Sequence, residues 1–167
     1  PRRFGIGGTL STIDGAGVEA FWQHRNLFGR AERLRFDARI AGIGQTLKPD
    51  ELTYRIGTSF VKPGVFTPDT NFIASISALR ESPDLYTRTG VAAEAGFTHI
   101  VNKQLSGRLL FRTALDKFED VLGTREFFSA GLVGAITHDS RDNAADATKG
   151  HLLEVTAEPF HEFRFGN

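Results

Sequence analysis

The chain has 167 residues, carries 20 Lys and Arg against 20 Asp and Glu, and contains no cysteine. The balanced charge gives no support for nucleic-acid binding, and the lack of cysteine excludes disulfide bridges, thiolate metal sites and a cysteine nucleophile. No apolar run approaches the ~20 residues that a membrane-spanning helix needs, whereas a membrane-spanning strand needs only about 9–11 alternating residues.

Nine segments show the alternation expected of β-strands, with turn residues between them. The 18 glycines and 15 phenylalanines of the chain also favour strands and turns. The expected strands are residues 4–12, 18–25, 32–42, 52–61, 71–79, 89–100, 105–115, 126–137 and 151–163. The sequence therefore predicts an all-β fold, built as one unit over residues 1–167 from successive antiparallel strands.

One stretch, residues 113–122 (TALDKFEDVL), fits two local structures. Ala114, Phe118 and Leu122 recur every four residues, and with neighbouring apolar residues they would form one face of a short amphipathic helix. We expect instead that the seventh strand, after residue 115, runs into a long loop.

The third segment shows most clearly that each strand has two chemically distinct faces. In RLRFDARI, residues 33–40, the odd positions are all charged and the even positions are all apolar. A soluble β-sandwich buries such an apolar face in a core, whereas a membrane barrel turns it toward lipid and lines its interior with the polar face. Alanines on the apolar face, charges of both signs on the polar face and strands of about nine to twelve residues favour the barrel, but leave the sandwich open.

Two stretches resemble the outer-membrane assembly factor family, whose barrels are also called surface-antigen barrels. GVEAFWQHRNLFGRAERLRF, residues 17–36, resembles the second and third barrel strands and their connecting turn, and EAFWQHRNLFG is most similar to the TamA-like branch. THDSRDNAADATKGHLLEVTAEPF, residues 137–160, resembles a second family signature, although Ala144 and Ala147 stand where the family often has prolines. The matching residues are Asn26, Leu27, Phe28 and Gly29 in the first stretch, and Asp139, Arg141, Asp142, Asn143, Thr148 and Gly150 in the second.

The resemblance implies an antiparallel up-and-down β-barrel in the outer membrane of a Gram-negative bacterium. Such a barrel contacts outer-membrane lipid and inserts or assembles client outer-membrane proteins, here with a TamB-like periplasmic partner. The resemblance implies no enzymatic activity, no cofactor and no nucleic-acid partner. Family barrels have about sixteen strands and follow periplasmic POTRA domains, so we expect the N-terminal half of a barrel, without POTRA domains and C-terminal strands. Its open sheet edges would favour self-association.

The first strand is the candidate seam for client pairing. In the family this strand closes the barrel against the last strand. Glycines weaken a strand and loosen its register, so we expect the seam to open and a client strand to add by β-augmentation. Alternatively, the glycines only relieve crowding at a barrel corner. The seam residues are Phe4, Gly5, Ile6, Gly7, Gly8 and Leu10.

No catalytic or metal site is predicted. The Asp139, Arg141 and Asp142 cluster lacks the spacing of a calcium loop, and we interpret it as charge pairs that orient a strand end and a loop. His138 and His151 flank that loop, but the five histidines show no zinc spacing.

Two aromatic residues are candidates for the belt that such barrels place at the membrane interface, namely Trp22 and Tyr54. Two alternatives to an assembly factor remain. One is a passive outer-membrane barrel or porin, and the other is a soluble β-sandwich binding module, for example for carbohydrate.

Overall fold

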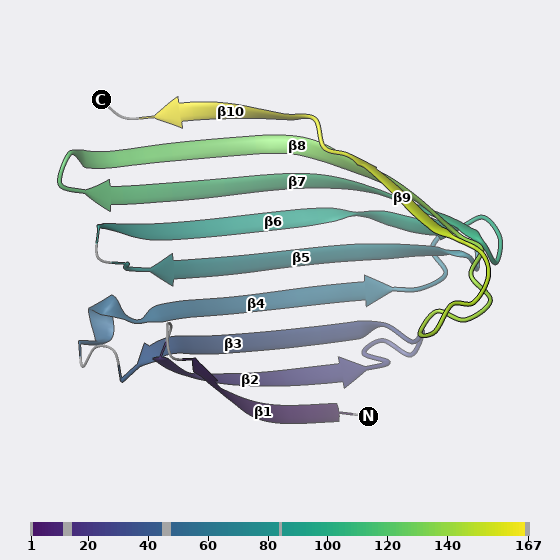
Figure 1. The fold of residues 1–167 in the computed structure, drawn as a ribbon, viewed down its shortest axis with the longest axis horizontal. Helices are drawn as coiled ribbons and strands as arrows, with labels where there is room; N and C mark the ends of the chain where they lie inside the picture. Colours follow the sequence, from purple (N-terminus) through teal and green to yellow (C-terminus); the bar gives the residue numbers. More distant parts are fainter. Residues whose placement is uncertain (1, 12–14, 45–47, 84, 166–167) are drawn as a thin grey trace.

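The computed structural model describes residues 2–11, 15–44, 48–83 and 85–165, and the strand end expected at Thr12 lies outside these residues. It consists of one antiparallel sheet whose strands follow one another in sequence order (Figure 1). The strands are β1 (Arg2–Ser11), β2 (Gly15–Arg25), β3 (Arg33–Ile43), β4 (Thr53–Lys62), β5 (Thr70–Glu81), β6 (Tyr86–Ile100), β7 (Leu105–Asp120), β8 (Gly123–Asp139), β9 (Leu152–Ala157) and β10 (Phe160–Phe165), with a 3-10 turn, η1 (Pro49–Glu51), before β4. The predicted all-β, up-and-down fold is confirmed as an open sheet of nine neighbouring strands, β1 to β8 and β10, with β9 beside the end of β8.

The two ends of the chain lie on opposite edges of this sheet (Figure 1). Within the described residues, β1 pairs with β2 alone, and β9 and β10 each pair with β8 alone. An open edge presents unpaired N–H and C=O groups, which is costly in a membrane. The sheet therefore has the form of a partial barrel wall with two unpartnered edges.

The strand expected over residues 151–163 is interrupted. β9 pairs with residues 134–139 of β8, and β10 pairs with residues 126–131. Pro159 lies between them and has no N–H to donate to a strand ladder, but its carbonyl accepts a bond from the Leu132 amide at 3.0 Å. The proline thus divides one strand into two short pieces that continue along the same neighbour.

The expectation of a loop after residue 115 is wrong. β7 continues to Asp120 and pairs with β8 up to Gly123, so residues 121 and 122 alone make the turn. Gly123 has φ +123°, a conformation that glycine adopts without strain. The helical spacing of this stretch is overridden because pairing with β6 on one side and β8 on the other satisfies its backbone along its length.

The register of the pairs keeps the two faces of the strands separate across the whole sheet, with most of the charged side chains on one side. We call one side the apolar face, and a row across it runs through Ile6, Ala20, Ala38, Ile56, Ala78, Val91, Leu115, Phe128 and Phe163. We call the other side the polar face, and a row across it runs through Gly7, Glu19, Arg39, Arg55, Leu79, Gly90, Asp116, Phe127 and Arg164.

The apolar face is not covered by any other part of the described chain. Phe36 is 47% exposed and Ile56 is 59% exposed, although both belong to strands inside the sheet. A soluble β-sandwich would seal these side chains under a second sheet. Within the described ranges there is one sheet, and no helix is long and apolar enough to cross a membrane. The β-sandwich alternative is therefore not supported.

The few buried apolar side chains lie on the polar face. Leu110, Val133 and Ala135 are each less than 7% exposed, and Leu110 pairs directly with Val133. Side chains crowd together on the inner side of a curved sheet and spread apart on the outer side. This burial indicates that the sheet curls toward its polar face, as in a barrel wall.

Candidate functional site

The glycines of β1 differ in what surrounds them. At Gly5 a Cβ atom would overlap the ring of Phe21, and at Gly7 it would come within 3.0 Å of the Glu19 carboxylate. Both positions lie on the polar face, where these glycines make room for large neighbours. Gly8 lies on the apolar face, and its nearest neighbour is the Gly17 carbonyl oxygen at 3.8 Å, an ordinary contact. Crowding therefore accounts for Gly5. At Gly7 the neighbour is the end of a flexible side chain, and Gly8 is not crowded.

The remaining seam residues present apolar side chains at the free edge of the sheet. Phe4, Ile6 and Leu10 all lie on the apolar face of β1 and are exposed. Phe4 also lines a shallow apolar groove of about 500 Å³ that crosses β1 to β5 and includes Trp22 and Phe36. The structure thus brings the predicted seam residues together along one edge, with backbone groups on that edge unpaired within the described residues.

The turn that carries the first family signature is built around a residue that sequence reasoning assigned to the third strand, Glu32. Its carboxylate accepts hydrogen bonds from the backbone N–H groups of Phe28 at 3.2 Å and Arg30 at 3.0 Å. Its carbonyl accepts the N–H of Asn26 at 2.6 Å and that of Leu27 at 3.4 Å. The turn residues Asn26 to Gly29 therefore wrap around one acidic side chain.

Conformation and burial explain why this turn needs its particular residues. Asn26 has φ +63° and Gly29 has φ +90°, and the Asn26 side-chain oxygen accepts the Ala31 N–H at 2.9 Å. Glu32 is only 1% exposed. Burial alone would raise the pKa of Glu32, but hydrogen bonds from the backbone of Glu32, Arg30 and Phe28 hold that pKa below its ordinary value. A glutamate three residues after Gly29 was the signal that could have identified it.

The second family signature forms a loop held by two aspartates. Asp139 accepts two bonds from the Arg141 guanidinium, at 2.9 and 2.8 Å, and one from the Arg141 N–H at 3.1 Å. The same guanidinium donates to the carbonyl of Ala144 at 3.1 Å. Arg141 thus ties the end of β8 to the middle of the loop.

Asp142 organises the other side of the loop. Its carboxylate accepts the N–H groups of Asn143, Thr148 and Lys149 at 3.0 to 3.1 Å, and the Thr148 hydroxyl at 2.5 Å. The Thr148 hydroxyl bond and these backbone donors lower the pKa of Asp142 to about 2. The Asn143 side chain caps the Ala145 N–H at 2.9 Å. Donors within the loop therefore satisfy both aspartates.

Gly150 closes the loop. It has φ +92°, and a Cβ atom at this position would overlap the backbone carbonyl of Ser140. The Ser140 N–H donates to the His151 carbonyl at 2.9 Å, and the Ser140 hydroxyl accepts the His151 N–H at 3.0 Å. All the residues of the second signature therefore act together in one closed turn.

The match to known families covers both of these turns. Residues 26–167 match the model of the Omp85 superfamily domain. The chain belongs to the Omp85 superfamily. Membership implies an outer-membrane location and a barrel that assembles or translocates outer-membrane proteins, in a family that is generally non-enzymatic. The comparisons with curated proteins and with solved structures found no match.

Two histidines meet beside the second turn of this Omp85 chain. The rings of His138 and His151 stack with centroids 5.0 Å apart, and the Ser140 hydroxyl lies 3.1 Å from Nδ1 of His151. A structural zinc site needs about four ligands. Across residues that the structure describes, no group of three His, Cys, Asp or Glu side chains could hold a metal ion.

The two predicted interface aromatics lie near opposite ends of the apolar face. Trp22, close to the β2–β3 turn, packs against Phe36 with ring centroids 5.8 Å apart. At that end the rings of Phe72 and Phe97 also touch, 5.6 Å apart. Tyr54 lies at the other end, where its hydroxyl donates to the Pro49 carbonyl at 2.7 Å. An apolar ring with a satisfied polar tip suits an interfacial position.

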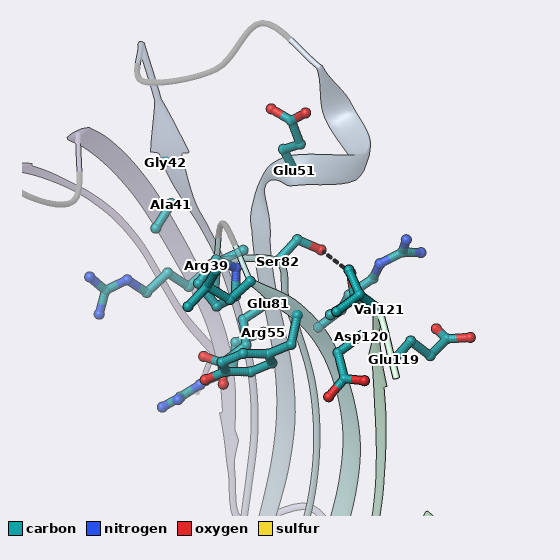
Figure 2. A pocket seen from close by; sticks show the side chains of 16 residues that line it. Arg39, Ala41, Gly42, Glu51, Arg55, Glu81, Ser82, Glu119, Asp120 and Val121 are labelled. Carbon is teal, nitrogen blue, oxygen red and sulfur yellow. Dashed lines mark hydrogen bonds between the residues drawn. The ribbon is translucent and has the colours of Figure 1, made fainter. Parts of the chain in front are cut away.

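A hollow of about 1,090 Å³ lies at the end of the Omp85 sheet that carries η1 (Figure 2). Arg39 and Arg55 line it from β3 and β4, and Glu81, Glu119 and Asp120 line it from β5 and the β7–β8 hairpin. These carboxylates already have partners: Glu81 contacts Arg88 at 3.5 Å, Glu119 contacts Lys117 at 2.9 Å, and Asp120 contacts Arg125. No local sequence pattern predicts this hollow, because its lining residues come from strands that are far apart in the chain.

Proposed function

We propose that this Omp85 chain receives client outer-membrane proteins at β1, which acts as a lateral seam of an assembly or translocation barrel. One observation carries the proposal: β1 has an unpaired edge in the described sheet and presents the exposed side chains of Phe4, Ile6 and Leu10 along it. A client strand could pair with this edge through backbone hydrogen bonds, as in other cases of β-augmentation.

The glycine content of β1 supports a seam that opens. Gly5 and Gly7 accommodate Phe21 and Glu19, so their role is at least partly steric. Gly8 has no such neighbour, yet it leaves a gap in the apolar face of an edge strand, where a β-branched residue would stiffen the backbone. Gly8 is therefore the position at which seam flexibility is best separated from crowding.

We further propose that this chain is part of a TamA-like subunit with a TamB-like periplasmic partner. The EAFWQHRNLFG sequence, which resembles the TamA-like branch of the family, supports this assignment. The two open edges support further strands or a second copy pairing with this sheet. The second candidate function, a passive outer-membrane barrel, would use the same exposed apolar face but would not need an edge that accepts other strands.

Cross-linking in the full-length protein tests the seam. A photo-reactive amino acid at Ile6 should capture a client during its assembly, because Ile6 lies on the edge strand. Ile56 is the matched control, since it lies in the same cross-strand row and is similarly exposed, but on the interior strand β4. Equal capture at both positions, or none at either, would remove the seam from the account.

Client assembly in liposomes separates the two candidate functions. We expect the full-length protein to speed the insertion of a second outer-membrane protein, and Gly8→Val to slow that insertion. Gly134→Val is the control, because Gly134 also lies on the apolar face and has no atom within 4 Å of its Cβ position. A passive barrel would leave the insertion rate equal to that of empty liposomes.

A further inference from the structure

Arginines on the polar face of β1 to β8 fall into two groups. On β6 to β8, Arg88, Arg108, Arg112 and Arg125 each contact a carboxylate. On β1 to β4 one arginine, Arg35, contacts a carboxylate, that of Asp37 at 3.7 Å. The other arginines there have no ion-pair partner within the described residues, and these are Arg3, Arg25, Arg33, Arg39 and Arg55.

Four of these unpaired arginines face each other directly. Arg25 is the cross-strand partner of Arg33, and Arg39 is the cross-strand partner of Arg55. All four are exposed. Like charges directly opposite on neighbouring strands are destabilising. Two such pairs on one wall therefore indicate that an external negative charge compensates them.

The nearby carboxylates of the chain do not supply that charge. Glu19 lies opposite Arg39, but its carboxylate leans the other way, over Gly7. Asp37 lies over Gly57 and contacts Arg35. The carboxylates that line the hollow beside Arg39 and Arg55 have other basic partners. Those of Glu81, Glu119 and Asp120 are given above, and Glu51 contacts Lys48 at 2.9 Å. The two arginine pairs thus remain open to a ligand.

We propose that the polar face of β2 to β4 binds an acidic segment of a separate polypeptide, which lies extended along β3. Arg25 and Arg33 would hold one carboxylate group, and Arg39 and Arg55 another. This site is distinct from the β1 edge and does not depend on the opening of the seam.

The spacing of the two pairs selects an extended chain. Arg33 and Arg39 are six residues apart on one strand, which corresponds to roughly 20 Å at about 3.3 Å per residue. A compact anion such as inorganic phosphate can reach one pair only. A polypeptide in extended conformation places carboxylates six residues apart at the same separation, and so engages both pairs together.

Fluorescence anisotropy with the full-length protein in detergent micelles tests the proposal. The probe is a labelled twelve-residue Gly/Ser peptide with two Glu-Glu pairs six residues apart. A peptide of the same composition with its four glutamates contiguous is the comparison probe, and inorganic phosphate is the competitor. We expect the split peptide to bind more tightly than the contiguous peptide, and to resist displacement by phosphate.

The variants locate the site. Arg39→Gln/Arg55→Gln and Arg25→Gln/Arg33→Gln should each weaken binding of the split peptide about fivefold to tenfold, as expected for losing two charge-assisted contacts. Arg2→Gln should leave binding unchanged, because Arg2 is exposed on the apolar face as the cross-strand partner of His24. Heat-modifiable gel mobility checks that each variant is folded.

Several outcomes would overturn the proposal. They are equal affinity for the two peptides, full displacement by phosphate, equal weakening by Arg2→Gln, or no binding to the folded protein. Full displacement by phosphate would assign the arginine pairs to a compact phosphate ligand instead.

Discussion

Arg112 on β7 reaches over β8 to Glu158, with 2.6 Å between Nη1 and Oε1, while its Nη2 lies 3.0 Å from Glu94 on β6. The β8 residue opposite Arg112 is Gly131, which has no side chain to obstruct the arginine. Arg108 contacts Glu154 of β9 across β8 in the same way, at 3.6 Å. These contacts across β8 fit a sheet that curves toward its polar face, in agreement with the burial of Leu110 and Val133 on that face.

Removing the Arg112 contact should weaken the attachment of the last strand. Arg112 and Glu158 are both about two-fifths exposed, so we expect Arg112→Gln to lower the free energy of unfolding by only ~0.5–1 kcal/mol. Urea unfolding of the full-length protein in micelles measures it, with Glu158→Gln completing a double-mutant cycle. Arg55→Gln is the control, since it removes an unpaired arginine and should not destabilise. An equal loss of stability in Arg112→Gln and Arg55→Gln would contradict the contact between Arg112 and Glu158.

The second signature turn should tolerate no side chain at Gly150. Gly150→Ala combines a positive φ with overlap on the Ser140 carbonyl, and we expect a loss of roughly 1–3 kcal/mol in the free energy of unfolding. Gly134→Ala is the matched control, because nothing lies within 4 Å of its Cβ position. The same urea titration distinguishes the two variants. Similar stability of both would show that the turn is not formed as described.

The loop around Asp142 should be insensitive to pH over the physiological range. Its folded pKa of about 2 lies below the ordinary value of 3.8, so its stabilising effect is complete above about pH 5 and is lost as the pH falls through 2. Hydrogen exchange at the Thr148 and Lys149 amides measures this. We expect Asp142→Asn to speed exchange at both amides near neutral pH, where the wild type is protected. Unchanged protection in Asp142→Asn would contradict the carboxylate's role.

The packing of Phe21 on Gly5 should make the two positions interdependent. Gly5→Ala places a methyl group against the ring of Phe21, and we expect looser β1–β2 pairing, seen as faster amide exchange in β1. Phe21→Ala in the same protein should restore much of the pairing, because it removes the obstructing ring. Additive effects of the two substitutions would mean that the ring does not occupy this position.

The sequence predicted the strands and their faces well, because period-two alternation depends only on which side each residue points to. It failed where pairing or a single residue overrides local pattern. The helical spacing around Phe118 gave way to pairing on both sides, and Pro159 split the last strand. Glu32 was missed because its role depends on the backbone of the turn folding around it. Arg39 and Arg55 are unpaired because the Glu19 and Asp37 side chains extend toward other residues. The period-two alternation of the sequence does not specify that direction.

The central claim is that the apolar face meets lipid while the polar face encloses water. The chain itself has no cysteine, so single cysteines introduced at positions 34 to 40 can be spin-labelled selectively once any cysteine outside this chain has been replaced by serine. Collision with dissolved oxygen reports lipid, and collision with a water-soluble nickel chelate reports water. We expect Leu34, Phe36, Ala38 and Ile40 positions to favour oxygen, and Arg35, Asp37 and Arg39 positions to favour nickel, in strict alternation. Loss of that alternation, or its reversal, would contradict the account.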